Sequence, residues 1–157
     1  MNGKKKPREE DIDKRVGAWT NHILSEISQL DNNKGIDILN SCGKDCCERS
    51  DFYQGALKIR NNNPSEKDID VLFDKFKEEF YSSGNITKTG DVISLIFEEC
   101  TCPLVEKGVN NSYLCNCTTG YSKRLFEVLF DREVSVDLEQ SILKGDSICK
   151  QTIEILD

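Results

Sequence analysis

Eight cysteines are the residues of this sequence whose type and spacing could do chemistry. Four of them form two C-x-C pairs, Cys100 with Cys102 and Cys115 with Cys117. In an extended backbone, residues i and i+2 point to the same face, so each pair would present two sulfurs side by side. The intervening segment, 103–114, is long enough for the chain to turn back. If the two pairs lie on antiparallel segments, all four sulfurs can converge.

Four converging thiolates predict a metal site. A tetrahedral four-thiolate site suits Zn²⁺, and iron or an iron–sulfur cluster is the softer alternative. The predicted ligands are Cys100, Cys102, Cys115 and Cys117. Two other interpretations stay open: inert thiols that pack as small apolar residues, and redox pairing, although a disulfide between residues i and i+2 would be strained.

Further cysteines are candidates for a pocket or for reactivity. Cys42 and Cys46 are separated by four residues and share one helix face, with Lys44 between them, and a nearby cation favours the thiolate. One interpretation is that Cys42 and Cys46 are reactive or metal-ligating thiols at the wall of a pocket. The other is that they belong to a helix end that simply packs on the sheet. Cys149 would face the core or the pocket wall. His22, the single histidine, is expected at the surface, with no catalytic motif around it.

Hydrophobic periodicity indicates helices in the first half of the chain. Apolar residues recur every three or four positions in the first predicted helix, which forms one amphipathic stripe of Ile12, Val16, Trp19, Ile23, Ile27 and Leu30. The predicted helices cover 9–30, 34–47, 51–60 and about 65–81.

The second half changes its period to that of a sheet. A run rich in β-branched residues predicts a buried strand, and later segments alternate apolar and polar residues. The predicted elements are strand 91–98, extended segment 113–117, helix 118–130, and strands 133–139 and 148–156. We therefore expect one α+β domain over 9–157, after a basic tail at 1–8, with N-terminal helices packed on a C-terminal antiparallel sheet that carries one helix.

Charge and hydropathy exclude several partners. The formal net charge is −7, which disfavours nucleic acid and anionic membrane surfaces because both require clustered cations. No segment approaches the roughly 20 apolar residues needed to span a bilayer, and no secretory signal is evident. We expect a cytoplasmic protein whose thiols are reduced.

The ordered cysteine motifs resemble a known group of proteins. These motifs are Cys42-Gly43-x-x-Cys46, Cys100-x-Cys102-Pro103, Cys115-x-Cys117-x-x-Gly120-Tyr121 and Gly145-Asp146-x-x-Cys149. Together they resemble uncharacterised bacterial and archaeal families related to the 4-vinyl reductase domain and to L-2-amino-thiazoline-4-carboxylic acid hydrolase-like proteins. This chain departs from the resemblance at Ser141, where a cysteine is common, and at Gln151, where an aromatic residue is common.

The resemblance implies a ligand-binding α+β fold, often dimeric, with a pocket between helices and sheet. The expected function is thus that of an intracellular small-molecule-binding domain with a cysteine-rich zinc site and an unknown physiological role. The alternative is a thiol- or metal-dependent hydrolase of a small cyclic amide or thiazoline carboxylate. The N-terminal helical layer could supply the two-fold interface of a homodimer.

Overall fold

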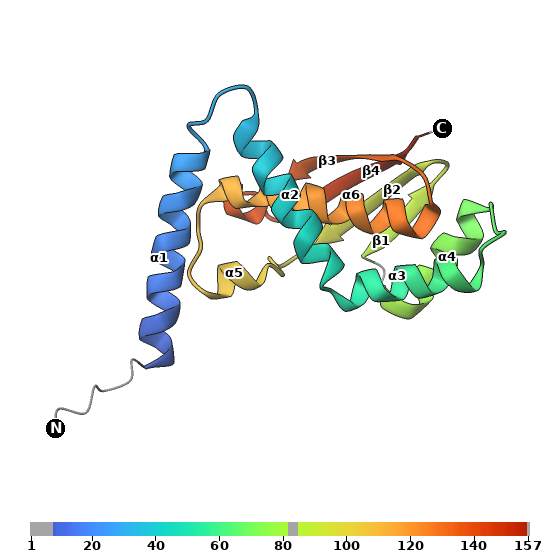
Figure 1. Cartoon of the computed structure of the whole chain (residues 1–157), viewed down its shortest axis with the longest axis horizontal. Helices are drawn as coiled ribbons and strands as arrows, with labels where there is room; N and C mark the ends of the chain where they lie inside the picture. Colours follow the sequence, from blue (N-terminus) through green and yellow to red (C-terminus); the bar gives the residue numbers. More distant parts are fainter. Residues whose placement is uncertain (1–7, 82–84, 157) are drawn as a thin grey trace.

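The computed structural model describes residues 8–81 and 85–156 and contains helices and one sheet (Figure 1). The helices are α1 (Glu9–Ile27), α2 (Lys34–Glu48), α3 (Asp51–Asn62), α4 (Ile69–Phe80), α5 (Pro103–Glu106) and α6 (Asn116–Phe130), with 3-10 turns η1 (Ser112–Cys115) and η2 (Ile142–Lys144). The strands are β1 (Ile86–Thr89), β2 (Val92–Phe97), β3 (Val134–Gln140) and β4 (Cys149–Ile155). The predicted α+β class is confirmed. Except for Arg8, the predicted basic tail lies outside the described residues.

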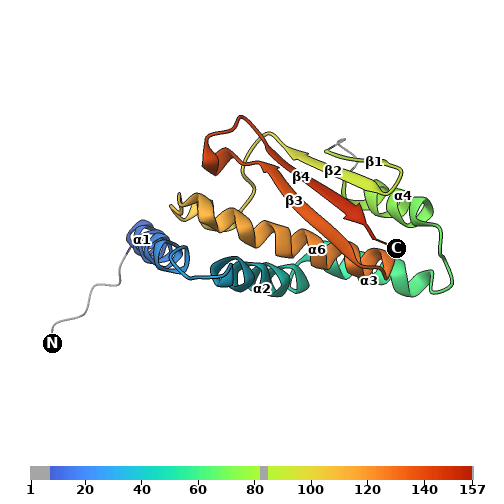
Figure 2. The ribbon, with the colours of Figure 1, turned by 90° about the horizontal axis from the view of Figure 1, so that it is seen from above.

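The four strands form one antiparallel sheet in the order β1-β2-β4-β3. The helices lie on one side of this sheet, and α6 lies between the sheet and α2 (Figure 2). The inward-facing residues of β4 are Gln151, Ile153 and Ile155, which are all buried. Their side chains alternate with polar ones because successive residues of a strand point to opposite faces.

The main core lies between the sheet and the helices that cover it. Phe76 of α4 meets Phe126 of α6 edge-on, with ring centroids 6.1 Å apart. Ile93 of β2 and Ile153 of β4 are opposite each other in the register, and both are fully buried against these rings. This core holds α6 against the sheet, and α2 packs on the other side of α6 (Figure 2).

Two glycines let α2 and α6 approach each other closely. A Cβ at Gly43 of α2 would lie closer than 3.0 Å to the backbone carbonyl of Cys117 and 2.8 Å from the backbone nitrogen of Tyr121. A Cβ at Gly120 of α6 would lie 2.6 Å from the Cα of Asn40. Only glycine fits at such a backbone contact. The cysteines that flank Gly43 are therefore held beside the start of α6.

The predicted packing of N-terminal helices against the sheet is confirmed by α3 and α4, whereas the first helix does not itself pack on the sheet. Instead, α1 contacts the segment 107–114 through its polar side, and α1 and this segment lie side by side in both views (Figures 1 and 2). The Asn21 side chain accepts hydrogen bonds from the backbone N–H groups of Asn110 and Asn111 at 3.0 and 3.2 Å. Leu24 adds one apolar contact to a small cluster with Leu39, Val109 and Leu114, here called the Leu24 cluster.

The predicted extended segment 113–117 is wrong. These residues form η1 and the start of α6 instead, because polar side chains satisfy the backbone groups of a helical start. Asn111 caps η1 by accepting from the backbone N–H of Tyr113 at 2.9 Å, and Thr118 donates to the carbonyl of Cys115 at 2.8 Å. Residues 103–106, read as loop, form α5, and the edge strand β1 was not predicted.

Candidate functional site

All eight cysteines are free thiols, and seven of them belong to one connected group. Each member of this group has another member close by, so that a thiolate at one cysteine raises the pKa of the other. The members, here called the thiol cluster, are Cys42, Cys46, Cys100, Cys102, Cys115, Cys117 and Cys149. The two C-x-C segments are thus near each other, although neither is a β-strand.

One half of the thiol cluster faces α2. Cys117 lies in the first turn of α6. Its pKa is raised most by burial and then, in decreasing order, by Cys46, Cys102 and Cys42. Burial, with smaller contributions from thiolates at these neighbours, raises the pKa of Cys117 to about 12. Both Cys102 and Cys117 are half-buried against the Leu24 cluster, whereas Cys42 and Cys46 are exposed on α2. The four sulfurs come from three separate segments.

The other half of the thiol cluster lies toward the sheet. Burial raises the pKa of Cys115, a hydrogen bond with Ser141 lowers it, and thiolates at Cys149 or Cys100 would raise it. The Cys115 Sγ and the Ser141 Oγ are 3.0 Å apart and both are buried. Cys149 Sγ accepts a hydrogen bond from the backbone N–H of Ile142 at 3.4 Å. Each C-x-C pair therefore contributes one sulfur to each half.

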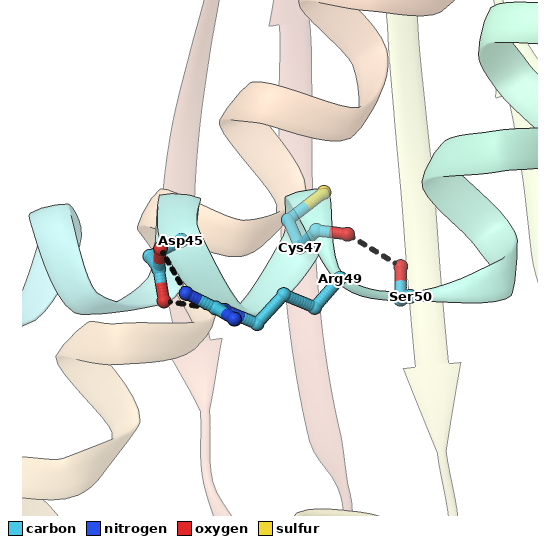
Figure 3. Close-up of polar contacts among 4 residues, drawn as sticks. All are labelled: Asp45, Cys47, Arg49 and Ser50. Carbon is cyan, nitrogen blue, oxygen red and sulfur yellow. Dashed lines mark hydrogen bonds and ion pairs between the residues drawn. The ribbon is translucent and has the colours of Figure 1, made fainter.

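The eighth thiol, Cys47, is also influenced by Cys46, but its side chain packs in the main core and it is therefore not counted in the thiol cluster. It is fully buried beside the core aromatic residues, and burial raises its pKa to about 12. Figure 3 shows its sulfur pointing away from the Asp45–Arg49 ion pair, where Arg49 Nε donates to Asp45 Oδ2 at 2.9 Å. The Ser50 hydroxyl donates to the Cys47 carbonyl at 2.7 Å and ends α2 (Figure 3).

Burial, more than any neighbouring charge, raises the pKa of the thiols of Cys102, Cys115 and Cys117. The Arg49 guanidinium, one turn from Asp45 at the end of α2, forms a two-point pair with that carboxylate, and the pair lowers the pKa of Asp45. Burial also raises the pKa of Cys102, against two backbone hydrogen bonds from Leu104 and Val105 that lower it. Among residues 8–81 and 85–156, no three His, Cys, Asp or Glu side chains are positioned, as they stand, to hold a metal ion.

A buried polar contact between α6 and β4 was not predicted from the sequence. The Ser122 hydroxyl donates to Gln151 Oε1, and Gln151 Nε2 donates to the hydroxyl of Thr118 at 2.7 Å. This contact explains why a glutamine is tolerated at an inward position of the last strand. The only sequence signal was a polar residue inside an alternating apolar pattern.

Two surface hollows lie away from the expected pocket between helices and sheet. One, of about 340 Å³, lies between α3 and α4 and is lined by Lys58, Asn62, Lys75 and neighbouring residues. The other, of about 300 Å³, lies on α1 beside Arg15, Val16 and Trp19. His22 is exposed on α1, as expected. No helix in the described part of the chain is both long and apolar enough to cross a membrane.

The fold and the thiol cluster together define an α+β protein with a cysteine-rich face. The model of the "Family of unknown function (DUF6144)" matches residues 3–157, so the chain belongs to this family. The prediction of an uncharacterised family is thereby confirmed. The relationship to 4-vinyl reductase and hydrolase-like proteins stays a prediction.

The remaining comparisons give solved structures of similar fold but no curated relative. No curated protein matches the sequence. The chain is similar to a trafficking protein particle complex subunit 3 from Naegleria fowleri, whose crystal structure was determined with covalently bound palmitic acid. The two sequences are 12% identical, the match covers 94% of this chain and 95% of that chain, and the TM-score is 0.48.

Proposed function

We propose that this protein is a binding module whose thiol cluster takes a thiophilic metal ion, zinc by preference. The observation that carries the proposal is that three cysteine-bearing segments meet: Gly43, between Cys42 and Cys46, lies against the backbone of Cys117, and Cys102 and Cys117 both pack against the Leu24 cluster. Thiolates prefer soft or borderline cations, and zinc with cysteine ligands is usually four-coordinate.

The electrostatics of the cluster supports a cation as its natural occupant. Burial and mutual repulsion hold the thiols of Cys102 and Cys117 neutral. A divalent cation removes both obstacles at once, because each coordinating thiol loses its proton to form a thiolate that the metal charge stabilises. The side chains would have to rotate toward one another, and on the exposed face of α2 such rotamer changes are inexpensive.

Two ligand sets share Cys102 and Cys117. The first adds Cys100 and Cys115, as predicted from the C-x-C spacing. The second adds Cys42 and Cys46, which influence Cys117 directly and sit one helical turn apart. We favour the second set, because α6 begins at Asn116 and residues i and i+2 of a helix point to different sides.

Metal analysis and thiol titration test the proposal. Protein purified without added metal, or reconstituted with Zn²⁺, should hold one zinc per chain, and four thiols should then be protected from a thiol reagent until a chelator is added. Cobalt substitution should give the sulfur-to-metal absorption of a thiolate site. Less than about a tenth of an equivalent of zinc after reconstitution, with no protected thiols, would remove the proposal.

Paired variants distinguish the two ligand sets. The double variant C42S/C46S should lose zinc if α2 supplies ligands, whereas C100S/C115S should lose it if the predicted set is right. The matched control is Cys47→Ala, which removes the core thiol next to Cys46 and leaves every proposed ligand in place. This control should bind zinc like the unaltered chain, and retention of zinc by both double variants would exclude both sets.

The resemblance supports two further elements of the proposal. A small-molecule ligand and a cytoplasmic location agree with the ligand-binding families named above and with eight free thiols, which persist in reducing compartments. If the chain is a thiol-dependent hydrolase instead, the exposed Cys42 and Cys46 are the accessible nucleophiles. Unchanged turnover of a thiazoline carboxylate by Cys46→Ser would exclude that thiol.

A further inference from the structure

The apolar stripe of α1 lies in solvent. Ile12 is 46% exposed, Val16 is 41% exposed and Trp19 is 67% exposed, and the half-buried Ile23 continues the same row. These four residues are here called the α1 stripe. With roughly 100° of rotation per residue, the stripe is centred about 120° around the helix axis from Gly17 and Leu24, which face the rest of the protein. Nothing in the described part of the chain covers it.

The helix is nevertheless firmly positioned, so this exposure is a feature of the fold. Its polar side carries the attachment: Lys107 Nζ contacts both carboxylate oxygens of Asp13 at 3.0 Å, and Asn21 binds the backbone of the 108–111 segment. A Cβ at Gly17 would run into the backbone of Lys107. An amphipathic helix held by its polar side has its apolar side available for a partner.

We propose that the α1 stripe docks against the α1 stripe of a second copy of this chain, with the two helices antiparallel about a two-fold axis. The spacing of the stripe, 12, 16, 19 and 23, alternates steps of four and three as in a helix–helix seam. An antiparallel register centred on residue 21 places Trp19 of one copy against Ile23 of the other and Val16 against Ile27, which continues the apolar row. The hollow lined by Arg15, Val16 and Trp19 lies at this position.

Charge complementarity favours a second copy as the occupant. Arg15 and Glu26 both flank the stripe on the side that faces away from the protein, and within residues 8–81 and 85–156 neither forms an ion pair. The register that pairs Trp19 with Ile23 also brings Arg15 of each copy beside Glu26 of the other. The acidic first turn, Glu9 to Asp11, makes an anionic lipid surface a poorer partner.

The size of the surface sets the strength of the dimer. A helix of 19 residues is about 28 Å long, and its single stripe offers less than the roughly 800 Å² per partner that stable complexes bury. We therefore expect a reversible dimer with a dissociation constant of about 10 µM, without involvement of the thiol cluster.

Sedimentation of the full chain from about 1 to 300 µM tests this interface, with a chelator present so that zinc plays no part. Trp19 is the only tryptophan, so its emission should shift to shorter wavelength over the same concentration range. Trp19→Ser should weaken association at least tenfold. The matched control is Ile96→Ser, which removes a similarly exposed apolar residue from the outer face of β2 and should leave association unchanged.

A charge-reversal cycle tests the register. Arg15→Glu and Glu26→Arg should each weaken the dimer about tenfold, and the double variant R15E/E26R should restore it. A monomer across the whole concentration range, or a dimer that Trp19→Ser does not weaken, would overturn the proposal. The proposal would also be overturned if the double variant R15E/E26R associates no more strongly than either single variant. A shift of the Trp19 emission with anionic vesicles, without self-association, would overturn it as well.

Discussion

The close contact between α2 and α6 at Gly43 gives a prediction with opposing contributions. Replacing Gly43 by alanine should gain about 1 kcal/mol of helix propensity, because glycine is the poorest non-proline residue in a helix interior. The same change places a Cβ against the backbone of α6, closer than 3.0 Å to the Cys117 carbonyl and 2.8 Å from the Tyr121 nitrogen. The sign of the net effect depends on which contribution is larger.

We expect the steric contribution to be larger. Ordinary contacts of a Cβ are 3.4 Å or more, so α2 would have to move away from α6 by more than half an ångström. Neither obstacle is a flexible side chain, and the shift would also strain the hydrogen bond between Thr119 and Asn40, at 2.6 Å. Overpacking costs about 1–3 kcal/mol, and we take about 3 because backbone lies on both sides. The net loss of unfolding free energy is then about 2 kcal/mol.

Urea denaturation measures this loss directly. With a slope of about 2 kcal/mol per molar urea, the midpoint for Gly43→Ala should fall by about 1 M with an unchanged slope. Ser41→Ala, an exposed substitution on the same helix, is the control and should change stability by less than about 0.5 kcal/mol. If Gly43→Ala is as stable as the unaltered protein, the close approach of the two helices is not real.

Other consequences of the site can be measured in the same material. Because each of the four coordinating thiols loses a proton when zinc binds, and burial raises the pKa of Cys102 and Cys117 among them, the zinc dissociation constant should fall by up to about 10,000-fold per pH unit between pH 6 and 8 in competition titrations. The raised pKa of Cys117 stabilises the metal-free fold below pH 9, and this contribution is lost as the pH rises from 9 toward 12; denaturation of Cys117→Ala should show a smaller loss over that window. Zinc at 100 times its dissociation constant should stabilise the fold by about 2.7 kcal/mol, and a chelator should reverse the effect in thermal melts. Gln151→Leu leaves the hydroxyls of Ser122 and Thr118 without their amide partner, and should cost about 1–3 kcal/mol in urea denaturation.

Periodicity predicted the elements that bury one complete face. Strand β4 was recognisable because Ile153 and Ile155 alternate with polar residues, and α4 because its aromatic residues recur at helical spacing. The edge strand β1 was missed for the same reason, because Ile86 is its only buried residue and one apolar side chain makes no pattern. Gly90, with φ of +58°, then turns the chain into β2.

Periodicity could not say which neighbour covers an apolar face. The stripe of α1 predicted its helix correctly, yet the polar residues Asp13 and Asn21 decide how that helix is attached. Hydrogen bonds to a distant loop leave no local signal in the sequence. A strongly amphipathic helix is therefore compatible with burial in its own chain or in an interface, and the choice between them is a tertiary one.

The thiol cluster shows the same limit at the level of single residues. The C-x-C spacing predicted converging sulfurs only for extended segments, but Cys115 and Cys117 lie in a helical start, where residues two apart are rotated by roughly 200°. One sulfur therefore faces the sheet and the other faces α2. What brings Cys42 and Cys46 to the second sulfur is Gly43, which sits between them and permits the contact with α6. A glycine in the middle of a helix costs about 1 kcal/mol, so it is itself a sequence signal of close packing. Read together with its flanking cysteines, it indicates that α2 presents thiols to a neighbouring helix.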